Sequence, residues 1–231
     1  MTSLAVGDIW QSTIAVIRPR LGELVAVAAP FTLLVDMVLT LYGPTPPQTM
    51  AGYTIDIVLV LLLLPALIGM IAQLAVTRLV AVPEEPPRLA LSAAFATAPL
   101  YLGALLLTAA PTALGMLLLI VPGLYLVARL YVVAPIIAVD RLGPVAAVQR
   151  SWTMTAGHGG PILLFLVLLL LFLFGASMLA AGVGSAFASV LAVVGLKAVG
   201  TFVAALIGAS VAMLMAIASA VAATVVYLKL R

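Results

Sequence analysis

The chain reads IVPGLYLVARLYVVAP over residues 120–135, and this stretch decides the fold. Its side chains are almost all apolar, as in a membrane-spanning helix, yet a proline stands near each end and Arg129 in the middle. An arginine at the centre of a span costs about 2.5–3.5 kcal/mol on insertion scales, so it has to face protein or water. The stretch therefore predicts a membrane helix whose charge needs a partner.

The composition of the whole chain points the same way. Of its 231 residues, 66% are hydrophobic and 7% are charged, whereas soluble domains are about 45–50% apolar and about 25% charged. Because so few charges cannot cover a soluble surface, we expect the lipid bilayer to be the main partner. The net charge of +3 comes from scattered basic residues, which argues against nucleic acid. The lack of cysteine excludes disulfides and thiolate chemistry.

We predict an all-α polytopic membrane protein with six transmembrane helices in a single membrane domain, 1–231. A span needs about 20 mainly apolar residues. The third and fourth predicted spans share one apolar run, and the count falls to five if that run is a single segment. Such a helix would be about 60 Å long, twice the hydrocarbon thickness, so we expect a hairpin broken near 115–123. The predicted spans are about 21–41, 54–79, 98–117, 119–139, 161–182 and 199–227.

Arginine and lysine predict the orientation of these spans. On one side of the predicted spans, Lys197 is the only basic residue in the loops. The first loop on that side, GPTPPQTMAG, has no charged residue. We therefore expect both termini to lie in the cytoplasm. The opposite side has eight basic residues: Arg18, Arg20, Arg78, Arg88, Arg141, Arg150, Lys229 and Arg231.

Three cytoplasmic links are amphipathic, and we predict interfacial helices over about 5–17, 86–96 and 144–155. Their predicted anchors are Trp10, Arg150 and Trp152. The sequence WQST at Trp10 aligns with WTMT at Trp152, and the same offset matches the starts of spans one and five. This suggests a threefold repeat of interfacial helix and hairpin. Chance similarity between amphipathic segments is the alternative.

The region 120–160 contains Pro122-Gly123, then Arg129, then Asp140 at the end of the helix, followed by an Arg150-Ser-Trp run. In these features it resembles the glycerophosphoryl diester phosphodiesterase membrane-domain family and related small bacterial inner-membrane proteins. The resemblance implies a membrane topology and a bacterial inner-membrane location. It implies no activity, because in fused members of the family this region looks like an anchor beside a separate catalytic domain.

Few residues suggest catalysis. His158, the only histidine, lies in a glycine-rich turn, and no Ser-His-Asp set, paired histidines or Gly-x-Ser-x-Gly motif accompanies it. We therefore predict no enzyme activity, no catalytic, cofactor-binding or metal residues, and no cofactor.

Arg129 and Asp36 form the candidate intramembrane polar site. At 1.5 Å per residue, Arg129 lies about 16 Å from the inner surface and Asp36 about 24 Å, a difference that two side chains could bridge. The simpler interpretation is a structural ion pair, or an arginine that caps carbonyls freed by Pro135. The other is a site for a polar solute or headgroup. We predict helix kinks at Pro122, Gly123 and Pro135, with a structural rather than a transport role.

The sixth predicted span has small residues at every fourth position, which let helices pack closely in lipid. Such a row drifts around the helix, so we expect it to contact at least two neighbours, with a dimer interface as the alternative. By contrast, the bulky segment 161–174 is the best candidate for lipid exposure. The predicted packing residues are Gly200, Ala204, Gly208 and Ala212.

Together these patterns predict a non-enzymatic inner-membrane protein with a role in scaffolding, envelope maintenance or partner support. Its predicted partners are lipid, and either a second copy or another membrane protein. The rival hypothesis is a transporter or channel for a small polar or anionic solute or lipid headgroup that uses Arg129. A hydrated path to Arg129 would favour the rival, and a closed, dry environment would remove its main residue.

Overall fold

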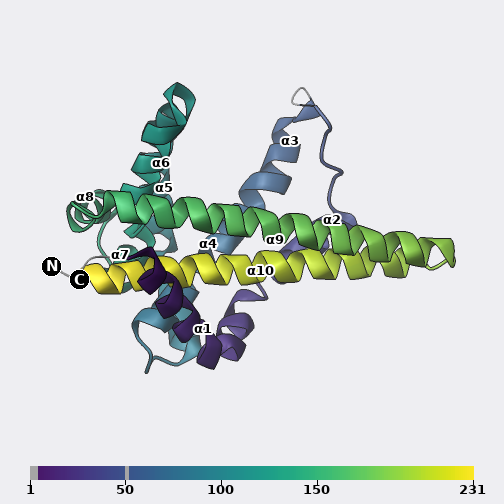
Figure 1. The fold of residues 1–231 in the computed structure, drawn as a ribbon, viewed down its shortest axis with the longest axis horizontal. Helices are drawn as coiled ribbons and strands as arrows, with labels where there is room; N and C mark the ends of the chain where they lie inside the picture. The colour runs from purple at the N-terminus through teal and green to yellow at the C-terminus, as the bar shows by residue number, and fades with distance from the viewer. Residues whose placement is uncertain (1–4, 50–51) are drawn as a thin grey trace.

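The computed structural model describes residues 5–49 and 52–231, and the regular elements of these residues are all helices. They are α1 (Val6–Ala28), α2 (Leu33–Tyr42), α3 (Ile55–Val58), α4 (Leu64–Ala81), α5 (Pro87–Leu118), α6 (Ile120–Arg129), α7 (Val133–Asp140), α8 (Pro144–Met154), α9 (Gly159–Val193) and α10 (Lys197–Leu230), with a π-helical segment, Leu59–Leu63, between α3 and α4. The predicted all-α fold class is therefore confirmed. Figure 1 shows α9 and α10 as a long antiparallel pair, with the α5–α6 hairpin and the α3–α4 arm on one side and α1 on the other.

Within the described residues, five helical segments are long and apolar enough to cross a membrane. A sixth exists if α1 and α2, which are bent by 49° relative to each other, cross as one broken helix. The chain thus has the features of a multi-pass membrane protein. The five segments are Ile55–Ala81, Pro87–Leu118, Ile120–Asp140, Gly159–Val193 and Lys197–Leu230.

Two of the three predicted interfacial helices are not separate elements. The segment 5–17 is the first part of α1, and 86–96 is the first part of α5. In α5 the buried side chains continue past the predicted boundary to Thr97, Tyr101 and Ala104, so the helix keeps a buried face beyond residue 96. Only 144–155 corresponds to a helix of its own, α8. The helix boundaries therefore do not reproduce the predicted threefold repeat.

The predicted first span, 21–41, is interrupted at Pro30, whereas the chain passes Pro19 as a continuous helix. Proline has no N–H to donate and its ring clashes with the preceding turn. The N–H groups of Phe31 and Thr32 both turn to the carbonyl of Ala28, and the Thr32 hydroxyl donates to the same oxygen at 3.0 Å. The predicted span 21–41 is therefore two helices.

A single extended residue, Leu119, separates α5 from α6, so the predicted break between the third and fourth spans is confirmed. A connection this short forces the two helices together at their tips. A Cβ atom on Gly123 would lie 2.6 Å from the backbone nitrogen of Met116, and one on Gly115 would lie 3.0 Å from Cα of Gly123. Pro122 stands in the first turn of α6, where its missing N–H is not needed. Pro122 and Gly123 thus mark a turn, not a kink within a span.

The α3–α4 arm contains one irregularity with a clear cause. The π-helical segment Leu59–Leu63 immediately precedes Pro65 in the first turn of α4. Since Pro65 cannot donate to the preceding turn and its ring crowds that turn, the backbone widens there.

The α9–α10 hairpin is longer than predicted: its helices have 35 and 34 residues, or about 50 Å each, against predicted spans over 161–182 and 199–227. Gly195, with a φ of +82°, forms the turn between them. The far half of α9 is mostly exposed, while residues 220–227 of α10 are all buried. The C-terminal half of α10 is therefore the central element of the helix packing, in contact with α1, α4, α7 and α9.

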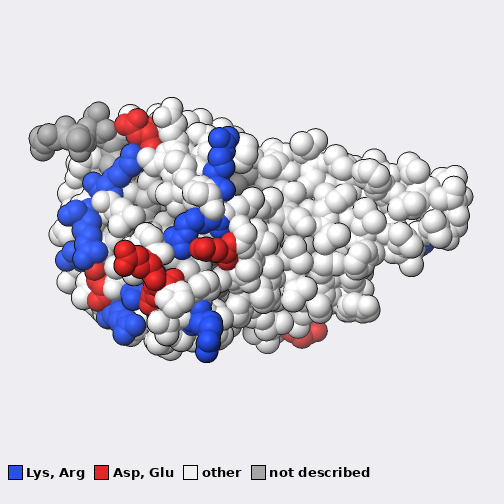
Figure 2. Space-filling model, turned by 90° about the horizontal axis from the view of Figure 1, so that it is seen from below, with Lys and Arg blue, Asp and Glu red and all other residues white. Residues whose placement is uncertain are grey.

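Charged side chains gather at one end of the molecule, near both termini (Figure 2). At this end Asp140 accepts the Tyr227 hydroxyl at 3.0 Å and lies 3.5 Å from Arg150 and 3.8 Å from Arg231. In the far half of the α9–α10 hairpin, Lys197 is the only charged residue. This division agrees with the charge asymmetry of the loops that the sequence shows.

Candidate functional site

Arg129 is the last residue of α6, at a break in the fourth span. The N–H of Val133 donates to Leu130 O instead of to Arg129 O, and Pro135 has no N–H for the carbonyl of Tyr131. The break, at 130–132, thus leaves the backbone carbonyl of Arg129 without a backbone donor. Pro135 therefore marks an interruption of the span, as predicted, although the interruption precedes it by three residues.

Two hydroxyls of α8 and its C-cap replace the missing donor. Ser151 Oγ donates to Arg129 O at 2.8 Å, and Thr155 Oγ1 lies 3.2 Å from the same oxygen. The Thr155 hydroxyl is also 2.7 Å from Ser151 O in its own helix. Both side chains are fully buried. The polar face of α8 therefore completes the hydrogen bonding of α6.

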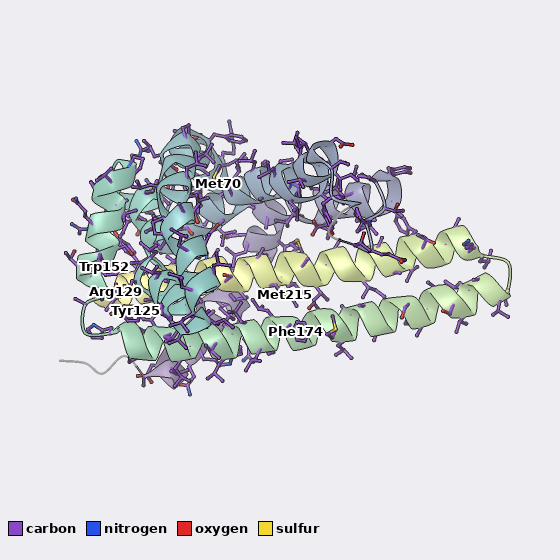
Figure 3. The ribbon with its side chains drawn as sticks, turned by 90° about the horizontal axis from the view of Figure 1, so that it is seen from above. Met70, Tyr125, Arg129, Trp152, Phe174 and Met215 are labelled. Atoms are coloured by element: carbon purple, nitrogen blue, oxygen red, sulfur yellow. The ribbon has the colours of Figure 1, made fainter. Side chains whose placement is uncertain are left out.

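The side chain of Arg129 does the same for α8. Its Nη2 donates to the backbone carbonyl of Trp152, which lacks an α-helical donor because the N–H of Ala156 turns to Thr153 O. The guanidinium carbon lies 4.5 Å from the centroid of the Trp152 ring, within the range of a cation–π interaction. A positive charge at the end of α8 also interacts favourably with the helix dipole. Figure 3 shows Arg129, Trp152 and Tyr125 together at one end of the molecule.

Arg129 and α8 thus cap each other, and the resulting contact is closed. Arg129 is only 5% exposed, and the cavities described below do not include it among their lining residues. Two other arginines make the same kind of contact at the charged end. Arg20 donates to Leu79 O in the last turn of α4 at 2.7 Å, and Arg78 donates to Ala138 O in the last turn of α7 at 3.1 Å. Capping a helix on another element is therefore a recurrent use of arginine in this fold.

The two hydroxyls should be partly redundant, and this can be measured. In either Ser151→Ala or Thr155→Val, the remaining hydroxyl can still donate to Arg129 O, so we expect each to lower the free energy of unfolding by about 1 kcal/mol. The double variant leaves a buried carbonyl unpaired and should cost more than the sum of the two. Unfolding in an SDS titration, followed by circular dichroism, gives these energies. Thr153→Val, on the exposed face of α8, is the matched control and should change little. Additive losses would contradict the shared role.

Asp36 does not pair with Arg129. It lies on α2 and lines a cavity of about 700 Å³ between α2 and the α9–α10 hairpin, together with hydroxyl-bearing residues that include Ser177 and Thr201. The estimate of depth at about 1.5 Å per residue, which placed Asp36 within reach of Arg129, assumed straight and parallel helices. It failed because α1 and α2 are bent by 49° relative to each other. Among the described residues, the ion pairs are Arg20–Glu23, Arg78–Glu85, Arg150–Asp140 and Arg231–Asp140.

The predicted interfacial anchors all contact other parts of the chain. Trp10 packs edge-on against Phe172 of α9, with ring centroids 5.3 Å apart. The Trp152 ring makes a cation–π contact with Arg129, and Arg150 forms an ion pair with Asp140. Trp152 also keeps 42% of its surface exposed, so one edge of it remains free to face the membrane interface.

The predicted packing residues of α10 contact different neighbours. A Cβ atom on Gly200 would lie 2.9 Å from Ala188 O of α9, and Ala204 lies against Gly184 of the same helix. Gly208 and Ala212 instead line the cavity with Asp36. In the bulky segment 161–174, one face is exposed, whereas Ile162, Phe165, Leu166 and Leu169 are buried against the core.

A second cavity, of about 420 Å³, was not predicted. Its polar lining comes from four elements, and each of them contributes only one to three of these side chains to an otherwise apolar sequence. Such isolated residues give no periodic signal, so only the packing of the helices brings them together. The polar residues are Gln73, Tyr101, Thr108, Thr112, Tyr131 and Ser219.

Across residues 5–49 and 52–231, no group of three His, Cys, Asp or Glu residues is placed to hold a metal ion. His158 is the N-cap residue of α9, with Nδ1 3.2 Å from Ala156 O. The fold thus defines an all-helical, multi-pass membrane protein with an internally capped arginine. Comparison with protein-family models, curated proteins and solved structures finds no match to this chain.

Proposed function

We propose that this chain is a non-enzymatic protein of the bacterial inner membrane, with both termini in the cytoplasm, that supports the assembly of a membrane partner. The observation that carries the proposal is the outer face of α9 in the far half of the hairpin. Gly175, Gly182 and Ser189 are seven residues apart, so they share one face of the helix, and all three are exposed.

No contact among residues 5–49 and 52–231 explains glycine at positions 175 and 182. A Cβ atom on Gly175 or Gly182 would meet no atom within 4 Å, and glycine in a helix costs about 1 kcal/mol relative to alanine. Small residues on a lipid-facing helix allow another helix to approach closely, and this close packing is what drives helix association in membranes. A transmembrane helix of a partner, either a second copy or another protein, therefore fits this face.

Crosslinking tests the proposal directly, because the natural chain has no cysteine. In membranes, Ser189→Cys should form a discrete crosslinked product with a bifunctional maleimide, and adding Gly182→Ile should abolish that product by blocking helix approach. Val190→Cys is the matched control, since Val190 is also exposed and is the next residue along the helix but points about 100° away. Equal crosslinking at positions 189 and 190 would contradict the proposal. The mass of the product distinguishes a second copy from another protein.

Transport of a small polar solute is the second candidate function, and the cavity lined by Asp36 is the observation in its favour. This cavity contains a carboxylate and several hydroxyls at membrane depth. It therefore suits a neutral or cationic solute better than the anionic solute expected from Arg129. The family resemblance stays a prediction, and no activity follows from it.

A further inference from the structure

The 420 Å³ cavity lies between α4, α5, the α6–α7 break and α10, and its polar groups are only loosely bonded to one another. The Tyr101 hydroxyl donates to Gln73 Oε1 at 3.3 Å, and the Tyr131 hydroxyl donates to Ser219 O at 3.5 Å. Both distances exceed the usual 2.5–3.0 Å for O–H···O bonds. Of the residues that the structure describes, none accepts a hydrogen bond from the side-chain amide of Gln73 or from the hydroxyl of Ser219. These donors can therefore bind an occupant.

The cavity is far from the charged end of the helices. Gln73 precedes the end of α4 by eight residues, or about 12 Å, and the lining contains no Lys, Arg, Asp, Glu or His. Unpaired polar groups at such depth are costly unless something polar bonds to them. With both donors and acceptors but no charge, the cavity fits an uncharged group with hydroxyl or ester oxygens.

The cavity is partly open at the surface of the helices, where α5 contributes exposed side chains to its lining. On α5 its outer edge is formed by Leu105 and Ala109, which are exposed, and by Thr112 nearer the hairpin tip. Ser219, which is half-buried, and the buried Ala223 line the cavity from α10. Figure 1 shows that the α5–α6 hairpin diverges from α9 and α10. An occupant with acyl chains could enter there and leave its chains in the lipid.

We propose that this cavity binds the uncharged glycerol-ester head of a neutral lipid such as a diacylglycerol. The volume falls within the usual range for small-ligand sites and would hold the head while the chains stay outside. The amide of Gln73 donates to an ester carbonyl, and the hydroxyls of Ser219 and Thr112 bond to the free hydroxyl of the lipid. The proposal requires only that the chain spans a membrane, and it is independent of the partner role of α9.

Native mass spectrometry of the full chain in detergent tests this site with three probes: 1,2-dioctanoylglycerol, dioctanoyl phosphatidic acid and glycerol. We expect an adduct with dioctanoylglycerol, at least tenfold less with phosphatidic acid, and no competition by glycerol. Gln73→Leu should reduce the dioctanoylglycerol adduct at least tenfold. Gln149→Leu, on the exposed face of α8, is the matched control and should leave it unchanged.

Ser219→Ala provides a second, smaller change if Gln73→Leu does not fold, as judged by gel filtration and thermal unfolding, and it should also weaken the adduct. Equal adducts in the wild type and in a folded cavity variant would overturn the proposal. Equal binding of phosphatidic acid would overturn the requirement for an uncharged head. Competition by glycerol would assign the site to a free polyol and overturn the lipid.

Discussion

Replacing Arg129 with methionine is expected to lower the free energy of unfolding by about 2–3 kcal/mol. Methionine fills a similar volume but cannot donate to Trp152 O, which then becomes a buried carbonyl without a partner. The cation–π contact with the Trp152 ring is lost as well. Relief from burying a charge offsets part of this loss, because Arg129 has no carboxylate partner among the described residues and its Nε makes no hydrogen bond. An SDS titration followed by circular dichroism measures the difference.

The control for this experiment is Arg88→Met, which removes an exposed arginine at the same end of the molecule and should change stability by less than about 0.5 kcal/mol. Arg129→Lys should be intermediate, since lysine can donate one hydrogen bond but has no planar group to stack on the indole. If Arg129→Met were instead more stable than the wild type, the arginine would be a strained residue kept for function. That result would revive the hypothesis of a solute site at Arg129.

Gly123→Ala is expected to cost about 3 kcal/mol, the upper range for overpacking a close contact. The added Cβ would lie 2.6 Å from the backbone nitrogen of Met116. A side chain could move away, but a backbone atom at the tip of a hairpin joined by one residue cannot move without separating α5 from α6. The thermal unfolding midpoint in detergent should therefore fall, and protease cleavage near residues 115–123 should increase.

Gly69→Ala is the matched control for the hairpin variant. Gly69 also lies within an apolar helix, but a Cβ atom there would meet nothing within 4 Å. Since alanine is the better helix former, this change should be neutral or stabilise the protein by up to about 1 kcal/mol. A similar loss of stability in both variants would show that glycine itself, rather than the close approach of α5 and α6, matters at position 123.

The assignment of Arg129 to helix capping changes where a functional site is to be sought. The transport hypothesis depended on an arginine with access to solvent or solute, and the geometry around Arg129 is a closed structural contact. The two cavities lie elsewhere, one lined by Asp36 and the other by uncharged groups around Gln73. Neither cavity includes a basic residue, so both disfavour the anionic solute that the sequence first suggested.

The features that the sequence could predict are those with a local physical cause. Span length against bilayer thickness predicted a break near 115–123, where the structure has it at Leu119, and the distribution of basic residues predicted the charged end. Pro135 predicted an interruption near Arg129, because a missing N–H has the same effect in any context. The break at Pro30 and the continuity through Pro19 were not predictable in this way, because packing against other helices decides whether a given proline interrupts a helix.

By itself the sequence determined that the chain is helical, that it is apolar enough for a membrane and that a buried arginine must find a partner. Only the tertiary structure decided that the partner is the end of α8 rather than Asp36, because α8 folds back beside the break in the fourth span. It also decided that polar residues scattered over α4, α5, the α6–α7 break and α10 line one cavity. The physical reason is the same in both cases: hydrogen bonds between distant segments depend on the angles at which helices cross, and those angles depend on how side chains pack.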